Sequence, residues 1–291
     1  MIRITDLSHS LGNTKVLDGV NLLIPEGTVM GLVGINGAGK STLLRLIAGV
    51  YTPEEGRIEL DCFSPTDERG REGVFFLPDD PYFTHQTTMK SMLKMYSSLY
   101  PVDLELYREL VKEFGLNERK PIRTFSKGMR RQAYIAVALA IRPRILLLDE
   151  AFDGLDPLAR HRVKNRLVEL VEDGKSTVII SSHALRELED FCDKYAVLDR
   201  MTVSSSGDIS ERVERYCKFM LAFVDGFEES MLRNLPVISM TASGKFVKVT
   251  FDGDAEEMEK RLRELSPTVM EQMPVDFEEV FINEVTKEER R

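Results

Sequence analysis

Cysteine is scarce in this chain: Cys62, Cys192 and Cys217 are widely spaced among 291 residues. Three such cysteines are too few and too scattered for a disulfide framework or a zinc site, and they are typical of thiols in a reducing compartment. Long apolar runs are missing as well. One of the longest, residues 134–141, is far below the roughly 20 residues that a membrane span needs. If the protein works at a membrane, we therefore expect another chain to cross it.

Basic residues are outnumbered, since 39 lysines and arginines face 48 aspartates and glutamates, for a formal net charge of −9. An acidic chain has no sequence-wide positive charge with which to hold DNA or RNA, so no nucleic-acid partner is expected. The first residues show no signal-peptide pattern, and we find no internal repeat or low-complexity segment. At 43% hydrophobic residues, the composition fits a soluble globular protein and excludes a disordered one.

Short apolar segments alternate with helical patterns over the first 215 residues. The expected strands are residues 2–7, 16–24, 28–33, 57–60, 74–77, 145–148 and 177–181. The expected helices are residues 41–48, 88–117, 126–141 and 157–173. This alternation predicts an α/β fold with a parallel sheet in its core.

The pattern changes at about residue 216. Strand patterns follow at 217–224, 237–241, 245–251 and 268–273, with helical patterns at 254–265 and 276–288. We therefore expect two domains: residues 1–215, and a small α+β appendage of residues 216–291.

A glycine-rich sequence stands between the expected strand 28–33 and the expected helix 41–48. It satisfies the phosphate-loop pattern G-x-x-x-x-G-K-[ST] in full. Its residues are Gly34, Ile35, Asn36, Gly37, Ala38, Gly39, Lys40, Ser41 and Thr42, and we expect all but Ile35 to contact a nucleotide. Glycines let backbone N–H groups surround phosphate oxygens, and the helix N-terminus adds the positive end of its dipole. Lys40 is placed to neutralise the β- and γ-phosphates, and Ser41 to bind Mg²⁺.

Two further apolar strands end in polar residues. Residues 145–148 precede Asp149 and Glu150, and residues 177–181 precede Ser182 and His183. Ligand sites on parallel sheets gather at the carboxyl ends of the strands. Asp149 is placed to hold Mg²⁺, Glu150 to orient or polarise an attacking water, and His183 to contact the γ-phosphate. With Lys40, the pair Glu150 and His183 forms the set of catalytic candidates.

Residues 125–132 read Phe-Ser-Lys-Gly-Met-Arg-Arg-Gln and open the alanine-rich helix before the acidic pair. This segment resembles the signature motif of ATP-binding cassette (ABC) ATPases. Residues 153–156, Asp-Gly-Leu-Asp, resemble their D-loop, and His183 resembles their switch histidine. The resemblance covers about residues 1–210, and the order and spacing of the motifs make it specific. It implies the P-loop NTPase fold of an ABC ATPase: a mixed sheet with a helical subdomain at about residues 80–142.

The resemblance implies that the chain hydrolyses ATP with Mg²⁺ as a head-to-tail dimer. Each ATP would lie on Lys40 and Ser41 of one copy and under Ser126 and Gly128 of the other, with Asp156 of the D-loop also at the nucleotide. Ser126 suits this position, because a helix that begins there would point its N–H groups and dipole at an anion.

Several positions depart from the family pattern. In the signature, Phe125, Lys127 and Met129 replace Leu, Gly and Gln, a variation that resembles bacterial export-type cassettes. Leu11 stands where an aromatic residue often stacks on adenine. Asp79 stands near the place of the Q-loop glutamine, and an aspartate there can still be a ligand for Mg²⁺ or for a water.

The leading interpretation is the ATPase subunit of a bacterial ABC transporter, of the export type known as ABC-2. It would lie at the cytoplasmic face of the membrane, attached to an integral permease subunit made as a separate chain. In such transporters a groove in residues 80–142 receives a helix of the membrane subunit. Residues 81–83 and 89–100 are candidates to line it, although for each single residue a place in the core is at least as well supported.

Other interpretations stay open at this point. One is a soluble ABC ATPase that acts on the ribosome or on DNA; the single cassette, the acidic balance and the lack of inserted coiled-coil heptads weigh against it. Another is a different P-loop enzyme, such as a kinase or a small GTPase, which residues 125–132 and the pair Asp149–Glu150 disfavour. The sequence does not name the cargo, and it does not choose between dimer contact, regulation and packing for the appendage.

Overall fold

The computed structural model describes residues 1–224, 226–276, 278 and 279. The chain divides into two compact units, residues 1–206 and 207–291, which are described separately below. This division lies earlier in the chain than the 215/216 boundary expected from the sequence, which falls between α8 (Ile209–Glu214) and β10 (Tyr216–Ala222). As the limit of an independently folding domain, that boundary stays a prediction.

The first unit is built around a six-stranded sheet in the order β5-β6-β7-β3-β8-β9. Its strands are β3 (Val29–Val33), β5 (Val74–Leu77), β6 (Ile145–Leu148), β7 (Thr177–Ser182), β8 (Lys194–Asp199) and β9 (Thr202–Asp208). Neighbours from β5 to β8 run parallel. Every residue of β3, β6 and β7 is buried, which explains their continuous apolar sequences. The carboxyl ends of these three central strands therefore meet at one edge of the sheet.

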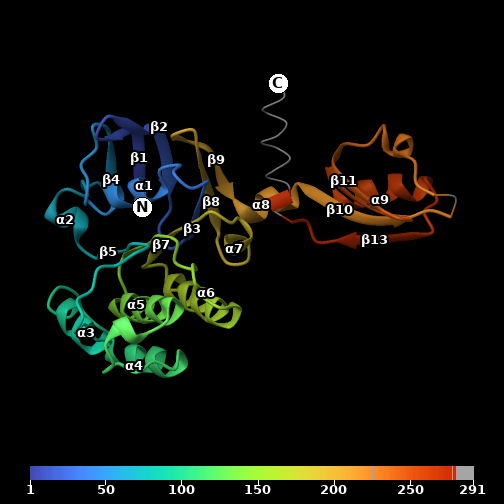
Figure 1. The fold of residues 1–291 in the computed structure, drawn as a ribbon. Coiled ribbons are helices and arrows are strands. Elements are labelled where there is room, and N and C mark those ends of the chain that lie inside the picture. The colour runs from blue at the N-terminus through green and yellow to red at the C-terminus, as the bar shows by residue number, and fades with distance from the viewer. Residues whose placement is uncertain (225, 277, 280–291) are drawn as a thin grey trace. The chain divides into compact units, whose positions relative to one another are not determined.

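A second, three-stranded antiparallel sheet has the order β2-β1-β4. It consists of β1 (Ile2–Leu11), β2 (Thr14–Ile24) and β4 (Glu55–Leu60). Helix α1 (Lys40–Ile47) shares one apolar core with both sheets, through Leu43, Leu44, Leu46 and Ile47. Figure 1 shows α1 on one side of the parallel sheet, with α5 (Lys127–Ile141) and α6 (Pro157–Val171) on the other side.

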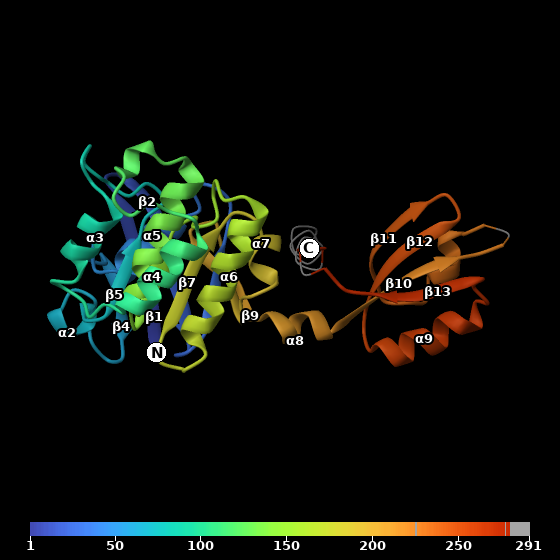
Figure 2. The same cartoon turned by 90° about the horizontal axis from the view of Figure 1, so that it is seen from below.

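The helical region carries α3 (Met89–Tyr96), α4 (Leu104–Glu113), the 3₁₀ turn η1 (Ile122–Thr124) and α5, which lie together in Figures 1 and 2. The single helical pattern of residues 88–117 is therefore two helices. Pro101 lacks the N–H that a continuous helix needs, and Asp103 begins α4 by accepting hydrogen bonds from the amides of Glu105 and Leu106 at 3.1 and 3.0 Å. The short helices α2 (Glu68–Arg71) and α7 (Arg186–Glu189) complete the unit.

The second unit is an antiparallel sheet in the order β11-β12-β10-β13, with one helix against it. Besides α8 and β10 it contains η2 (Glu229–Leu232), β11 (Val237–Ser243), β12 (Phe246–Asp252), α9 (Ala255–Glu264) and β13 (Val269–Met273). Met258 and Leu262 of α9 pack on a core that alternate residues of β10 and β12 supply. Most of the helix expected at 276–288 lies outside the described residues.

The fold expected from the sequence is confirmed, since an α/β core with a helical region precedes an α+β unit. Strands β8 and β9 were not expected, and the core holds two sheets where the pattern indicated one. No helix in the described part of the chain is long and apolar enough to cross a membrane.

Candidate functional site

The loop between β3 and α1 has the conformation that its glycines require. Gly37 and Gly39 have φ of 84° and 102°, which L-residues with a side chain rarely adopt. A Cβ on Gly34 would lie 2.5 Å from the carbonyl oxygen of Leu198, so the close approach to β8 also needs glycine. The N–H groups of the first helical turn have no partner within α1, and the loop therefore faces the sheet edge with backbone donors suited to phosphate oxygens.

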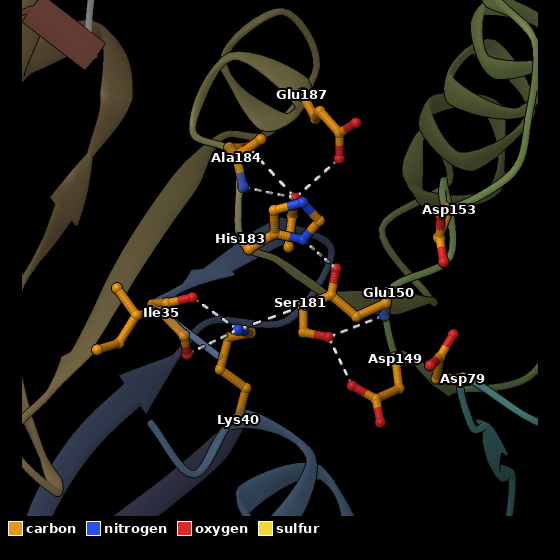
Figure 3. Close-up of polar contacts among 12 residues, drawn as sticks. Ile35, Lys40, Asp79, Asp149, Glu150, Asp153, Ser181, His183, Ala184 and Glu187 are labelled. Atoms are coloured by element: carbon orange, nitrogen blue, oxygen red, sulfur yellow. Dashed lines mark hydrogen bonds and ion pairs between the residues drawn. The ribbon is translucent and has the colours of Figure 1, made fainter. Parts of the chain in front are cut away.

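Lys40 begins α1 and points back over the loop (Figure 3). Its side chain is 5% exposed, and its Nζ donates to the carbonyl oxygens of Gly34 and Ile35 at 2.6 and 3.2 Å. The same Nζ lies 3.4 Å from Oε1 of Glu150. The ammonium group is thus fixed where the loop and the end of β6 meet.

Ser41, Asp149 and Ser181 are joined by short hydrogen bonds. The hydroxyls of Ser41 and Ser181 both donate to Oδ1 of Asp149, at 3.0 and 2.7 Å. Asp149 is 1% exposed, and its Oδ2 is a buried atom with no hydrogen-bond partner in the described part of the chain. A buried carboxylate oxygen without a partner is costly, and it fits a cation at this position.

Glu150 and His183 face each other across the ends of β6 and β7 (Figure 3). Nδ1 of His183 lies 3.0 Å from Oε2 of Glu150. Glu150 has φ of 47°, a left-handed conformation that costs energy for a residue with a side chain. Its amide donates to the hydroxyl of Ser181 at 2.9 Å. The structure thus brings together Lys40, Glu150 and His183, the three catalytic candidates.

The turn that carries His183 is held by its neighbours. The hydroxyl of Ser182 donates to Oε2 of Glu187 at 2.8 Å and accepts from the amide of Ala184 at 3.0 Å. Glu187 also pairs with Arg160 of α6 at 2.9 Å. These contacts fix the backbone on both sides of a histidine whose own side chain is 56% exposed.

The 125–132 segment packs on residues 153–156 of the same chain. Ser126 begins α5 and accepts from the amide of Met129 at 3.2 Å, as expected for a helix cap. A Cβ on Gly128 would lie 2.5 Å from the carbonyl oxygen of Gly154, so only glycine fits this contact. Lys127 pairs with Asp153, and the hydrogen bond from Lys127 lowers the pKa of the Asp153 carboxyl.

Asp156 begins α6, where its carboxylate accepts from the amide of Ala159 at 2.9 Å and Pro157 takes the first helical position. In the described part of the chain, Ser126 makes no hydrogen bond to residues 34–42. Within one copy the structure therefore gathers two groups of candidate residues: the loop with the strand ends, and Ser126 and Gly128 beside the 153–156 turn.

Asp79 follows β5, and its carboxylate lies 2.7 Å from Nη2 of Arg131. The sequence analysis did not single out Arg131, which is 4% exposed on α5. Every residue of α5 from 131 to 141 is buried, so helical periodicity does not mark this position. Ser181 was also not assigned a role, and its only signal is a polar residue at the end of an apolar strand.

A pocket opens beside Arg131, between the loop after β5 and α5. It is lined by Asp79, Asp80, Pro81, Phe83, Lys127, Arg130, Arg131 and Tyr134. The Arg130 guanidinium lies 5.7 Å from the centre of the Phe83 ring, and burial raises the pKa of Tyr134 to about 12. Tyr82 is 92% exposed, whereas Met89 and Met92 are core residues. Of the residues expected to line a groove, 81–83 thus are partly or fully exposed. Segment 89–100 contains both buried and exposed residues, since Met95 and Leu99 are 53% and 72% exposed.

The chain is similar to proteins of known family. A family model described as "ABC transporter" matches residues 17–153. The ABC transporter ATP-binding protein YtrB of Bacillus subtilis is 31% identical over 284 residues, which are 97% of each chain. The chain belongs to the ABC transporter ATP-binding proteins.

The family is supported by further similarities. The Nod factor export ATP-binding protein I of Rhizobium etli is 29% identical over 291 residues, covering 97% of this chain and 92% of that protein. A solved structure of an ATP-binding subunit of an ABC transporter is 29% identical, with a TM-score of 0.67 over 73% of this chain and 91% of its own. This ABC subunit therefore binds ATP on a P-loop core, and the relatives do not favour a ribosome- or DNA-directed ATPase.

Proposed function

We propose that this ABC subunit hydrolyses ATP to ADP and phosphate with Mg²⁺, and that it drives a separate membrane subunit of a bacterial exporter. The observation that carries the hydrolytic part is the convergence of Lys40, Asp149, Glu150 and His183 at the carboxyl ends of three parallel strands. This edge of a parallel sheet is where substrates bind, and the residue types match those that phosphoryl transfer requires.

Phosphate binding follows from Lys40 and the loop. Phosphate oxygens would replace the carbonyl oxygens of Gly34 and Ile35 as partners of the Lys40 ammonium, which is desolvated and close to the loop amides. The remaining residues assigned to the nucleotide are Asn36, Gly37, Ala38, Gly39 and Thr42. Their backbone N–H groups and the α1 dipole would complete the phosphate cradle.

Ser41 and Asp149 fit Mg²⁺. Both offer hard oxygen ligands 3.0 Å apart, and Oδ2 of Asp149 is buried without a partner among the described residues. Mg²⁺ keeps several waters and binds substrate phosphates, so two protein groups suffice. When bound, it supplies electrostatic stabilisation of the charge that develops on the phosphate oxygens.

Glu150 would accept a proton from the attacking water. The water oxygen would bond to the γ-phosphorus as the bond from that phosphorus to the bridging oxygen breaks, and ADP would leave with that oxygen. His183 lies against the same carboxylate at 3.0 Å, where it would orient Glu150 and contact the γ-phosphate. Lys40 would neutralise charge on the phosphates throughout.

We further propose that two copies close head to tail over two ATP molecules. Ser126 and Gly128 would cover the γ-phosphate bound by the other copy, with Asp156 at the same interface. The tight packing of Gly128 on Gly154 supports this proposal, because it makes the signature and the 153–156 turn one surface. ATP would then bridge the two copies, and hydrolysis would release them.

Export at the cytoplasmic face of the membrane, through an integral permease subunit, is supported by the family and by the relative whose name specifies Nod factor export. The surface residues 81–83 and the adjoining pocket are the proposed contact with that permease. Purification of the tagged full chain from solubilised membranes of the native host tests this part. We expect a polytopic membrane protein to co-purify in near-equal amount. Ribosomal or DNA-repair proteins without a membrane chain would contradict the proposal and favour the soluble ABC ATPase.

A further inference from the structure

Arg131 is a buried arginine that contacts two loops of the site at once. Its Nη1 donates to the carbonyl oxygen of Pro78 at 3.0 Å, and its Nη2 to that of Asp79 at 2.8 Å. The same Nη2 lies 2.7 Å from the Asp79 carboxylate and 3.2 Å from the carbonyl oxygen of Glu150. One guanidinium on α5 therefore connects the loop after β5 with Glu150, two residues beyond the end of β6.

The charge of Arg131 needs a partner, because its side chain is only 3% exposed. Asp79 provides the carboxylate, and its own side chain is 51% exposed. An arginine at such a place is held by the planar fork of its guanidinium, which lysine cannot reproduce. The carboxylate of Asp79 thus forms an ion pair with Arg131 of α5 in this structure, and this role differs from binding Mg²⁺.

The main chain of Glu150 is held from both sides. Its amide donates to Ser181 at the end of β7, at 2.9 Å, and its carbonyl oxygen accepts from Arg131 on α5, at 3.2 Å. Glu150 also has φ of 47°. A strained conformation of this kind persists only where the surroundings over-determine it, and it sets the direction of the side chain. Here that direction is toward Lys40 and His183 (Figure 3).

We propose that Arg131, charge-balanced by Asp79, is the positioning residue for Glu150. It does not touch the nucleotide; it holds the peptide that aims the catalytic carboxylate and couples that peptide to residues 78 and 79. Asp79 then acts through Arg131 and not as a metal ligand. The inference rests on the proposed hydrolysis, because the position of Glu150 affects ATP turnover only if Glu150 is catalytic.

Steady-state ATP hydrolysis by the full chain tests this role, with variants Arg131→Lys, Asp79→Asn and the double variant. Arg131→Lys should lower kcat about tenfold, because small misplacements of a catalytic group are costly. KM for ATP should stay within about twofold, since the phosphate loop is untouched. Asp79→Asn should lower kcat about threefold, as expected for a half-exposed pair. In the double variant, kcat should match that of Arg131→Lys alone, because both residues act through one contact.

Three further measurements make the test specific. Titration with a fluorescent ATP analogue should give wild-type affinity in every variant, which separates positioning from binding. The Mg²⁺ concentration for half-maximal turnover should not change in Asp79→Asn. Arg142→Lys is the matched control: Arg142 ends the same helix and pairs with Asp103 at 3.2 Å, at the opposite end of β6 from Glu150, so the kcat of this variant should equal that of the wild type.

Wild-type kcat in Arg131→Lys, or a raised Mg²⁺ requirement in Asp79→Asn, would overturn the inference. If Arg131→Lys does not fold, Asp79→Asn decides alone: reduced kcat with unchanged affinity and Mg²⁺ requirement supports it, and wild-type kcat rejects it. Glu150→Gln, measured in parallel, distinguishes failure of the proposed function from failure of the role proposed for Arg131. Full turnover in Glu150→Gln would contradict the proposed function itself. Wild-type kcat in Arg131→Lys, together with an inactive Glu150→Gln, would contradict only the role of Arg131.

Discussion

Two carboxylates, one in each unit, receive a similar set of hydroxyl donors and differ in their charge balance. Asp149 in the first unit accepts from Ser41 and Ser181. Glu279 in the second accepts from Ser239 and, at 2.8 Å, from Thr250, and it also pairs with Lys218. Glu279 thus has its cation within the chain, whereas Asp149 keeps a buried oxygen without a partner in the described part of the protein.

The two carboxylates differ as we expect a structural carboxylate and a metal-binding carboxylate to differ. Three adjacent strands place the partners of Glu279 in register with one another: Lys218, Thr250 and Ser239. The sheet therefore holds all three side chains where one carboxylate can contact them. Such a fully satisfied cluster adds stability and specifies packing. A carboxylate buried without its cation lowers stability, and proteins retain such groups where a ligand supplies the missing charge.

Asp149→Asn should have the largest effect on activity. The change keeps the shape and removes the charge, so we expect turnover with Mg²⁺ to fall roughly a hundredfold to a thousandfold. Thermal unfolding without nucleotide should show at least wild-type stability, because an uncompensated buried charge is gone. Mg²⁺-dependent turnover within a few-fold of the wild type would remove the distinction between the two carboxylates.

Ser181→Ala should have an intermediate effect. The hydroxyl joins Asp149 to the amide of Glu150, so its loss should lower kcat about tenfold while ATP affinity changes little. Thr250→Val in the second unit is the matched control, since it removes a hydroxyl that donates to the other carboxylate. It should leave kcat unchanged, and a similar fall in both variants would show that the loss is one of general stability.

Glu279→Gln should act on stability alone. It leaves Lys218, whose side chain is 15% exposed, without its carboxylate, and we expect the second unit to lose about 1–3 kcal/mol. Hydrogen exchange of the amides in β10–β12 measures this loss directly. ATP turnover should stay at the wild-type level. Reduced turnover together with unchanged exchange would assign Glu279 to the catalytic machinery.

The pH dependence of the second unit should show the smallest effect. Burial alone would raise the pKa of Glu279, but hydrogen bonds from Lys218, Ser239 and Thr250 outweigh it, so the pKa lies below its ordinary value of 4.5. The stabilisation is therefore present above the pKa of the unfolded state and is lost as the pH falls through the lower pKa of the folded state. Protection of the amides in β10–β12, measured as exchange relative to the intrinsic rate at each pH, should fall below about pH 5 in the wild type, and less so in Glu279→Gln. An equal response in both would contradict the pairing.

The sequence was sufficient where chemistry is carried by neighbours along the chain. The loop at 34–42 and the strands that end in Asp149 and His183 follow from glycine geometry and from apolar periodicity. The helix starts at Ser126 and before residue 157 were predicted by the same local logic, because a cap interacts with amides only two or three residues away.

The remaining features depend on contacts between distant segments. Arg131 is 52 residues from Asp79, and its position in the sequence resembles that of any basic residue at a helix start. The Glu279 cluster joins residues from four separate segments. Strand β8 begins and ends with charged residues, Lys194 and Asp199, and was not predicted. The break within 88–117 is an exception, because it is local: the segment was predicted as helical from its composition, and Pro101 and the Asp103 cap divide it into two helices.

The most direct test of the central claim is ATP binding and hydrolysis by Glu150→Gln in the full chain. We expect ATP affinity within about threefold of the wild type and turnover reduced at least about a hundredfold, because only the group that accepts the proton is lost. Light scattering should then detect a dimer that persists with ATP. Wild-type turnover in Glu150→Gln would contradict the assignment of the strand-end cluster as the site of hydrolysis.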